Sequence, residues 1–309
     1  MITQQIGIAI VAPAGQALDP CAVDRGIARL EQQGCLVHNY YDHASIHERF
    51  GGTDEGRLAQ LEAAVADPAV QIIMAIRGGY GSTRLLPRID FEAIAASGKL
   101  IVGFSDVTAL HMGLMARTGA LSYAGPMAAV DFGIPEPVQF TLDNFWQCLA
   151  GPTHTITECV SGNPCIDEAG TVWGGNLAMV VSLLGTPYFP RIDGGILYLE
   201  DIAEHPYRVE RMLLQLHQAG VLARQRALVL GDFSGYKLAP NDNGYDFAAM
   251  LAHLRATLPL PVIDGLSFGH IPRRVTIPFG AQGRLVSHAG GFTLTLSDYP
   301  TLRQADGCN

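Results

Sequence analysis

Ser105 stands where a predicted strand meets a predicted helix, a position from which a serine hydroxyl can act as a nucleophile. The apolar run 100–104 is typical of a buried parallel strand, and from Asp106 onward Leu110 and Leu114 recur at helical spacing. The unpaired N–H groups in the first turn of a helix can stabilise negative charge that develops beside such a hydroxyl. A serine at this junction is more often only the N-cap of the helix, so both interpretations stand at this point.

Two further residues have the types that a nucleophilic serine needs. Glu200 ends the apolar run 196–199, and His270 lies in a loop confined by a glycine and a proline. Taken singly, a carboxylate at a strand end is most simply solvated, and a loop histidine is most simply a surface residue. Together with Ser105 they form a candidate triad, in which His270 takes the serine proton and Glu200 orients the imidazole.

The residues around Ser105 depart from the usual nucleophile elbow. In α/β-hydrolases the serine lies in a GxSxG turn, and the triad follows the chain order serine, acid, histidine, as it does here. This chain has Gly103 before the serine but Val107 in place of the second glycine. The ordinary α/β-hydrolase fold is therefore disfavoured, although triads recur on several folds.

The first half of the chain alternates between strand and helix patterns. Strands are expected at 6–12, 35–41, 70–76 and 100–104, and helices at 20–33, 54–66, 91–97 and 140–149. This rhythm predicts a parallel sheet with helices on both faces and with its sites at the carboxyl ends of the strands. Ser105 and the Gly78–Gly79 loop both fall at such ends.

The residue pattern of the sequence changes after residue 150. Residues 151–168 are rich in turn-forming residues and lack periodicity, so we expect a linker there. Residues 1–150 are then an α/β domain that carries Ser105. Residues 169–309 are a smaller, β-rich domain that carries Glu200 and His270.

Composition excludes several classes of protein. The net charge is −9 and lysine occurs only twice, whereas nucleic-acid binding requires clustered basic residues. No apolar run reaches the roughly 18 residues of a membrane span, and the N-terminal segment lacks the cationic start of a signal peptide. The six cysteines, Cys308 among them, show no CxxC spacing. We therefore expect a cytoplasmic protein with reduced thiols, no metal site, and no nucleic-acid or membrane partner.

The glycine-rich loop 77–84 (RGGYGSTR) suggests a rival class, a non-hydrolytic dinucleotide-binding protein. It follows a predicted strand and nearly matches GxGxxG. However, Arg84 takes the place of the third glycine, and Asp90 follows it by six positions where about 20 are typical. Cofactor binding is therefore not expected.

Five long motifs together resemble one known family. In chain order they are RGGYGSTRLLPRID, VGFSDVTALH, WGGNLAMVVSLLGTP, LYLEDIAEHPYRVERML and GHIPRRVTIPFGA. They are similar to those of the LD-carboxypeptidases, also called murein tetrapeptide carboxypeptidases, over nearly the whole chain. The resemblance implies a serine peptidase with a Rossmann-like or flavodoxin-like N-terminal domain and a smaller β-rich C-terminal domain. It also implies a homodimer that removes the terminal D-Ala from cytoplasmic peptidoglycan tetrapeptides, with Ser105 as nucleophile, His270 as base and Glu200 as orienting acid.

Acyl transfer and carboxypeptidase specificity call for further groups. The backbone N–H groups of Asp106 and Gly79 are the expected donors to the oxyanion. The free carboxylate of the substrate requires a cation, for which Arg77, Arg84 and Arg273 are the candidates.

A related class, the microcin-immunity peptidases, would keep the triad but cleave a peptide–nucleotide conjugate. Such a protein is expected to need an aromatic base-stacking element in its C-terminal half. The chain has only two tryptophans, Trp146 and Trp173, so this alternative is disfavoured.

Overall fold

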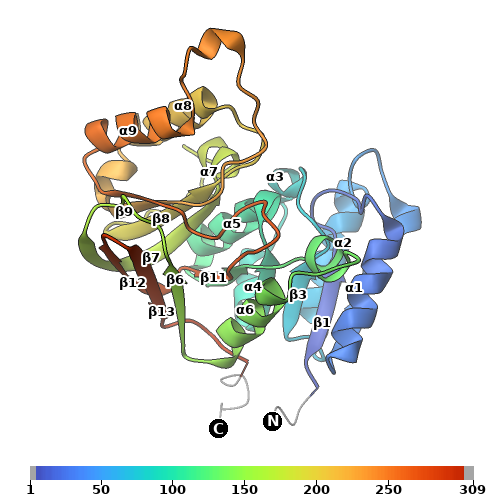
Figure 1. Cartoon of the computed structure of the whole chain (residues 1–309). Coiled ribbons are helices and arrows are strands. Elements are labelled where there is room, and N and C mark those ends of the chain that lie inside the picture. The colour runs from blue at the N-terminus through green and yellow to red at the C-terminus, as the bar shows by residue number, and fades with distance from the viewer. Residues whose placement is uncertain (1–4, 303–309) are drawn as a thin grey trace.

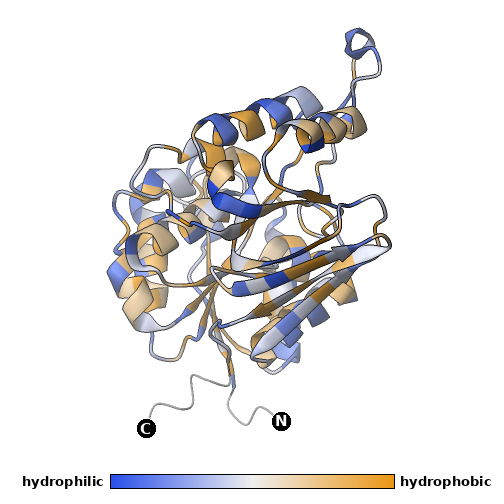
Figure 2. Ribbon diagram, turned by 90° about the vertical axis from the view of Figure 1, so that its left-hand side faces the viewer, coloured by the Kyte–Doolittle hydropathy of each residue, from blue (hydrophilic) through white to orange (hydrophobic). Residues whose placement is uncertain are grey.

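The computed structural model describes residues 5–302 and contains two β-sheets with helices packed against them (Figure 1). Cys308 and the outermost residues of the two expected domains lie outside the described part of the chain. Figure 2 shows hydrophobic residues gathered on the inner strands, whereas the outer helices carry both hydrophobic and hydrophilic residues.

The first sheet has six strands in the order β11-β5-β4-β3-β1-β2. Its strands are β1 (Gly7–Val11), β2 (Leu36–Asn39), β3 (Ile72–Ala75), β4 (Leu100–Gly103), β5 (Ser122–Ala124) and β11 (Ile277–Phe279). All neighbours run parallel except β11, which is antiparallel to β5. The parallel α/β sheet expected from the sequence is confirmed.

Helices cover both faces of this sheet. They are α1 (Pro20–Gln32), α2 (Asp54–Ala66), α3 (Ser82–Leu85), α4 (Phe91–Ser97), α5 (Thr108–Thr118) and α6 (Gln139–Ala150), with the short turns η1 (His43–Ser45), η2 (Ser105–Val107) and η3 (Ala128–Phe132). Both α1 and α6 pack against η3, whereas α4 packs against α2 and α5. The bounds of α2 and α4 are those predicted. In α2, Thr53 caps the N-terminus through a bond from Gly56 N, and Leu58 and Leu61 bury the inner face.

The second sheet has seven strands in the order β10-β9-β8-β7-β12-β13-β6. These are β6 (Thr153–Glu158), β7 (Ile166–Asn176), β8 (Gly195–Glu200), β9 (Gln225–Leu230), β10 (Val262–Asp264), β12 (Gln282–His288) and β13 (Gly291–Ser297). The helical segments around it are α7 (Leu177–Ser182), α8 (Pro206–Gln218), α9 (Phe247–Thr257), η4 (Leu222–Arg224) and η5 (Pro240–Asp242). Strands β7 to β10 are parallel, and β12, β13 and β6 add an antiparallel part.

The segment 151–168 is not a free linker, because its first half forms the edge strand β6. This strand pairs with β13 and buries His154, Ile156 and Glu158 on one face. Two of these three residues are polar and find partners: His154 bonds Asn144, and Glu158 accepts a bond from the backbone of a neighbouring loop. A half-buried strand is usually predicted from apolar residues at alternate positions. In β6 that pattern is missing because two of its three buried residues are polar.

Candidate active site

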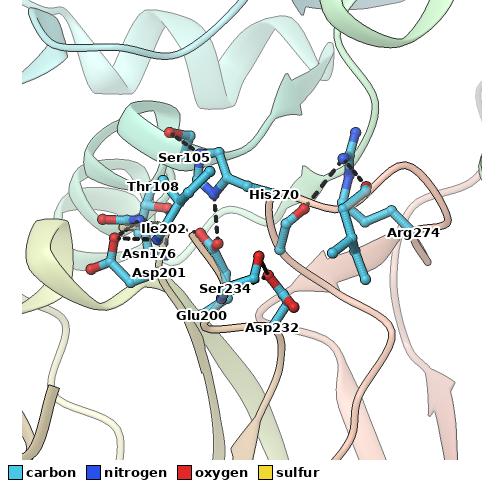
Figure 3. A network of polar contacts seen from close by, with 12 residues as sticks. Ser105, Thr108, Asn176, Glu200, Asp201, Ile202, Asp232, Ser234, His270 and Arg274 are labelled. Atoms are coloured by element: carbon cyan, nitrogen blue, oxygen red, sulfur yellow. Dashed lines mark hydrogen bonds and ion pairs between the residues drawn. The ribbon is translucent and has the colours of Figure 1, made fainter. Parts of the chain in front are cut away.

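The fold brings Ser105, His270 and Glu200 into one chain of hydrogen bonds (Figure 3). Ser105 Oγ lies 3.0 Å from His270 Nε2, and His270 Nδ1 lies 2.8 Å from Glu200 Oε2. Both distances are within the range of about 2.6–3.2 Å over which a base removes a proton. The arrangement has the geometry of a nucleophile, a base and an orienting acid.

Strand β11 explains how a histidine from the second half of the chain reaches this serine. Ser105 directly follows Phe104 at the carboxyl end of β4, and β4, β5 and β11 are neighbours in the first sheet. His270 lies in the loop that leaves β10 of the second sheet and enters β11 of the first. The return of the chain to the first sheet therefore carries His270 across to Ser105.

Ser105 has a strained backbone, with φ at +62° in the left-handed region that non-glycine residues rarely adopt. Gly78, from the loop after β3, packs directly against it. A Cβ atom on Gly78 would lie 2.7 Å from Ser105 Cβ and 2.8 Å from Ser105 Oγ. Val107 takes the place of the elbow's second glycine, and its side chain packs against Gly103, where a Cβ would be only 3.0 Å away. The close approach thus comes from Gly78 on a neighbouring loop.

Glu200 is fully buried, and Asn176 is the neighbour that the sequence did not reveal. The β7–β8 register pairs the two residues, and Asn176 Nδ2 donates to Glu200 Oε1 at 3.3 Å and to Asp201 Oδ1 at 2.9 Å. The backbone N–H of Asn176 donates to Thr108 Oγ1 of α5. Its N-cap position before the apolar run of α7 was the available signal.

Asp201 faces away from the histidine. Its second carboxylate oxygen accepts the N–H of Ala178 at the start of α7, at 2.9 Å. Burial raises the pKa of Asp201 to about 6, while its bonds to Asn176 and the backbone oppose this shift. Of the two acids that end β8, only Glu200 therefore contacts the imidazole.

Asp106 extends the site through its side chain as well as its backbone. Its buried carboxylate accepts the N–H of Ser82 at 2.8 Å, and burial raises its pKa. The Asp106 N–H lies in the first turn after Ser105, 3.2 Å from where a Cβ on Gly78 would be. Gly79, the other expected oxyanion donor, is the next residue of that loop and has φ at +108°. The two expected donors thus belong to adjoining segments.

Two of the three candidate arginines are engaged elsewhere. Arg84 Nε pairs with Asp54 Oδ2 at 2.9 Å. Arg273 donates to Ser267 Oγ at 3.1 Å and lies 3.7 Å from the ring centre of Phe140. Neither guanidinium is free of a side-chain partner.

Arg77 differs from these two arginines because it donates to a backbone oxygen, Gln16 O, at 3.0 Å. A Cβ on Gly79 would lie 3.4 Å from its Nη2, so the guanidinium borders the expected oxyanion loop. Burial, and to a lesser degree the like charge of Arg49, lowers the pKa of Arg77. A positive charge without a carboxylate partner among the described residues therefore lies beside this loop.

Comparison with known protein families finds a match in each half of the chain. Residues 8–125 match the LD-carboxypeptidase N-terminal domain, and residues 169–285 match the LD-carboxypeptidase C-terminal domain. The chain belongs to the LD-carboxypeptidase family. The family resemblance noted from the motifs is confirmed, and the protein is a serine-type carboxypeptidase.

Individual LD-carboxypeptidase relatives cover nearly the full chain. A putative carboxypeptidase of Streptomyces coelicolor is 35% identical and covers 96% of this chain and 94% of its own. A probable murein peptide carboxypeptidase of Bacillus subtilis is 29% identical over 90% of this chain and 88% of its own. The solved muramoyltetrapeptide carboxypeptidase of Oxalobacter formigenes is 49% identical, with a TM-score of 0.92 over 96% of this chain and 100% of that one.

The loop that carries His270 separates two hollows in this LD-carboxypeptidase. One, of about 270 Å³, is lined mainly by apolar residues, including Val130 and Ile202, and reaches His270. The other, of about 470 Å³, includes Asp232 and Asp264, and Ile271 borders both. Of the two hollows, only the apolar one is lined by His270 itself. Within residues 5–302, no helix has both the length and the apolar character needed to cross a lipid bilayer.

Proposed function

We propose that this LD-carboxypeptidase hydrolyses the bond between the terminal D-Ala and the L-centre of the diamino acid in murein tetrapeptides. In this proposal Ser105 is the nucleophile, His270 the general base and Glu200 the acid that orients it. The observation that carries the proposal is the continuous hydrogen-bond chain from Ser105 through His270 to Glu200, in a chain of this family. The similar muramoyltetrapeptide carboxypeptidase supports the choice of substrate.

The reaction follows from the geometry of these three residues. His270 Nε2 removes the proton from Ser105 Oγ, which attacks the carbonyl carbon of the bond to D-Ala. The carbon–nitrogen bond then breaks, and His270 passes the proton to the leaving amine. Water, deprotonated by the same imidazole, hydrolyses the ester on Ser105. The buried Glu200 stabilises the imidazolium formed in each half of the reaction.

The tetrahedral oxyanion requires donors beside the nucleophile. We assign the backbone N–H groups of Asp106 and Gly79 to this task, because both border Ser105 through Gly78. Each such donor contributes about 2.7–4 kcal/mol to transition-state stabilisation in comparable sites.

The free carboxylate of D-Ala is the second feature that a carboxypeptidase must recognise. Arg77 is the favoured partner, because Arg84 is paired with Asp54 and Arg273 is bonded to Ser267. A guanidinium can bind both carboxylate oxygens in parallel, and that of Arg77 borders Gly79, whose N–H is an expected oxyanion donor.

Release of D-Ala from a murein tetrapeptide tests the proposal. We expect the parent protein to release D-Ala, measured with a coupled D-amino-acid oxidase, and to leave the same peptide ending in L-Ala intact. Ser105→Ala should lose activity by at least about 1,000-fold while keeping the melting temperature of the parent. Parental activity in Ser105→Ala, or no D-Ala release by the parent, would refute the proposal.

One alternative substrate has support from a relative. The microcin C7 self-immunity protein of Escherichia coli is 29% identical over 84% of this chain, and solved forms of it share the fold, with a TM-score of 0.88 in one case. Against this alternative, Trp173 is fully buried, bonded to Gln225, and cannot stack on a base. Tyr207, in the second half of the chain, has an exposed ring that could stack on a base. Hydrolysis of an aminoacyl sulfamoyl adenosine faster than of the tetrapeptide would favour the alternative.

The compartment, the partners and the oligomeric state of the enzyme belong to the same proposal. The substrate class implies a cytoplasmic enzyme whose partner is a small peptide, without nucleic acid or membrane, and the family resemblance implies a homodimer. Light scattering of the purified chain checks the last point.

A further inference from the structure

Arg274 is a buried arginine that bonds the backbone on both sides of His270, the residue proposed as the general base. Its Nη1 donates to Ile271 O at 2.7 Å and to Gly269 O at 3.2 Å, the carbonyls on either side of His270 (Figure 3). Only 4% of Arg274 is exposed. Because the two carbonyls flank His270, fixing both restricts the backbone rotations that aim its side chain.

The other end of the guanidinium is anchored in the first half of the chain. Nη2 of Arg274 pairs with the buried carboxylate of Asp131 in η3, which also accepts the N–H of Met127 at 2.8 Å. The backbone N–H of Arg274 donates to Thr141 Oγ1 of α6 at 2.9 Å, and that hydroxyl donates to Pro272 O at 2.7 Å. The loop of His270 is thus fastened to η3 and α6. The N–H of Ala129 in η3 donates to Ile76 O, directly after β3 of the sheet that carries Ser105.

A ring contact completes the link to the nucleophile. The Arg274 guanidinium lies 4.0 Å from the ring centre of Phe104, the residue that precedes Ser105. The Phe104 ring in turn meets the His270 imidazole edge to face, with centroids 5.2 Å apart. Arg274 therefore contacts the serine-bearing segment on one side and the histidine-bearing loop on the other.

Stability alone does not account for a buried ion pair at this place. Removing two charges from water is costly, and apolar residues of similar volume often replace such pairs with no loss of stability. A planar guanidinium, by contrast, presents its donors in a rigid fork that can bond two carbonyls and a carboxylate in fixed directions, whereas an apolar side chain has no donors and the rotatable ammonium of a lysine does not reproduce this geometry.

We propose that Arg274, held by Asp131, is a positioning residue that keeps the His270 imidazole within hydrogen-bond distance of Ser105. This role rests on the proposed function, because it presumes that His270 is the base. It deepens that proposal by naming the residue that connects the histidine-bearing loop to the serine-bearing segment.

The test compares Arg274→Ala with the parent full-length chain in D-Ala release from a murein tetrapeptide. A misplacement of the base by about 1 Å costs about 100-fold in rate, so kcat should fall by that order while KM stays within about threefold. Added guanidinium chloride at non-denaturing concentration should restore at least about tenfold of the lost kcat, because the ion can occupy the vacated site.

Arg255→Ala is the matched control. Arg255 also donates to two backbone carbonyls, Val262 O and Gly162 O, both at 3.1 Å, but it contacts none of the site residues. We expect this control to lower the melting temperature while leaving kcat unchanged and unresponsive to guanidinium.

Parental kcat in folded Arg274→Ala, or a loss that guanidinium does not reverse, would overturn the positioning role. If the alanine variant does not fold, Arg274→Lys serves instead. A fall in its kcat of about tenfold at unchanged KM supports the role, and parental kcat overturns it. Ser105→Ala separates the two proposals: full activity in that variant removes the proposed function, whereas its inactivity beside an unaffected Arg274→Ala removes only this inference.

Discussion

At the scale of single residues, the site depends on an energetically unfavourable backbone conformation at Ser105. A positive φ costs a non-glycine residue about 1–3 kcal/mol, and the surrounding structure must maintain it. Gly103 and Gly78 make this possible, because the first accommodates Val107 and the second lies against the serine itself. The absent second glycine of the usual elbow is therefore compensated by a glycine from another loop.

Gly78→Ala is a direct test of this close approach. The new methyl group would lie 2.8 Å from Ser105 Oγ and 3.2 Å from Asp106 N, so we expect kcat for D-Ala release to fall by about 100-fold. The control is Gly56→Ala in α2, where a Cβ would meet only Thr53 Oγ1 at 3.5 Å. That helical substitution should leave kcat unchanged and raise stability by about 0.5–1 kcal/mol. Parental kcat in Gly78→Ala would contradict this expectation, because it would mean that the loop moves to accommodate the methyl group.

At the scale of elements, the side chain of Asp106 ties η2, the turn that contains Ser105, to the start of α3. The carboxylate accepts the N–H of Ser82, and the fully buried Arg57 of α2 donates to Gly81 O at 2.9 Å on the same loop. The loop that contains Gly79 is thus held from two sides. The two proposed oxyanion donors owe their relative placement to this tether.

Asp106→Ala should therefore disturb catalysis without removing any backbone donor. The buried Ser82 N–H would lose its acceptor, at a cost of about 1–3 kcal/mol in stability, and we expect kcat to fall by at least about tenfold. Asp106→Asn keeps an acceptor and should lie between this variant and the parent. Asp90→Ala removes a similar carboxylate, which accepts Ala93 N at the start of α4, and should lower stability alone. Equal kcat in the Asp106 and Asp90 alanine variants would argue against the tether.

The sequence predicted those elements that carry their own signals. The bounds of α2 and α4 followed from their caps and apolar spacing, and Ser105 followed from its place between a strand and a helix. Strand β6 was missed because polar His154 and Glu158 fill its buried face. The residues of β11 were expected in the β-rich second half, and the sequence did not reveal that this strand joins the first sheet.

Contacts between distant segments were also beyond the sequence. Asn176 meets Glu200 through strand register, and Arg274 meets Asp131 across 143 positions of chain. Such contacts depend on tertiary packing, for which no local pattern exists.

At the scale of the whole molecule, the site lies where the two sheets are fastened to each other. Thr108 of α5 accepts the N–H of Asn176 at the end of β7, and α5 also packs against α7. Strand β11 adds a second connection by crossing from one sheet to the other. Because the proposed nucleophile comes from one half of the chain and the proposed base from the other, a substitution that loosens this junction should affect activity together with stability.

The buried histidines predict how stability depends on pH. Burial lowers the pKa of His111 in α5 and of His154 in β6 to about 4, so between pH 6.5 and 4 the unfolded chain binds more protons than the folded one. Stability is therefore lost as pH falls through this window, by about 2 kcal/mol for each histidine at pH 5. Asp201 acts in the opposite sense, because burial raises its pKa to about 6, and it regains only about 1 kcal/mol between pH 7 and pH 5. Taken together, these three groups make the protein less stable at pH 5 than at pH 7.

Urea unfolding of His111→Gln at these two pH values tests this account. The imidazole Nε2 of His111 bonds Gly103 O at 2.9 Å, directly before the nucleophile segment, and a glutamine amide can donate there without titrating. We expect the variant to be less stable than the parent at pH 7 but to lose about 2 kcal/mol less on moving to pH 5. His253→Gln, an exposed position on α9, should keep the parental difference. If His111→Gln also kept it, the acid sensitivity would have to arise elsewhere than at the junction of the two sheets.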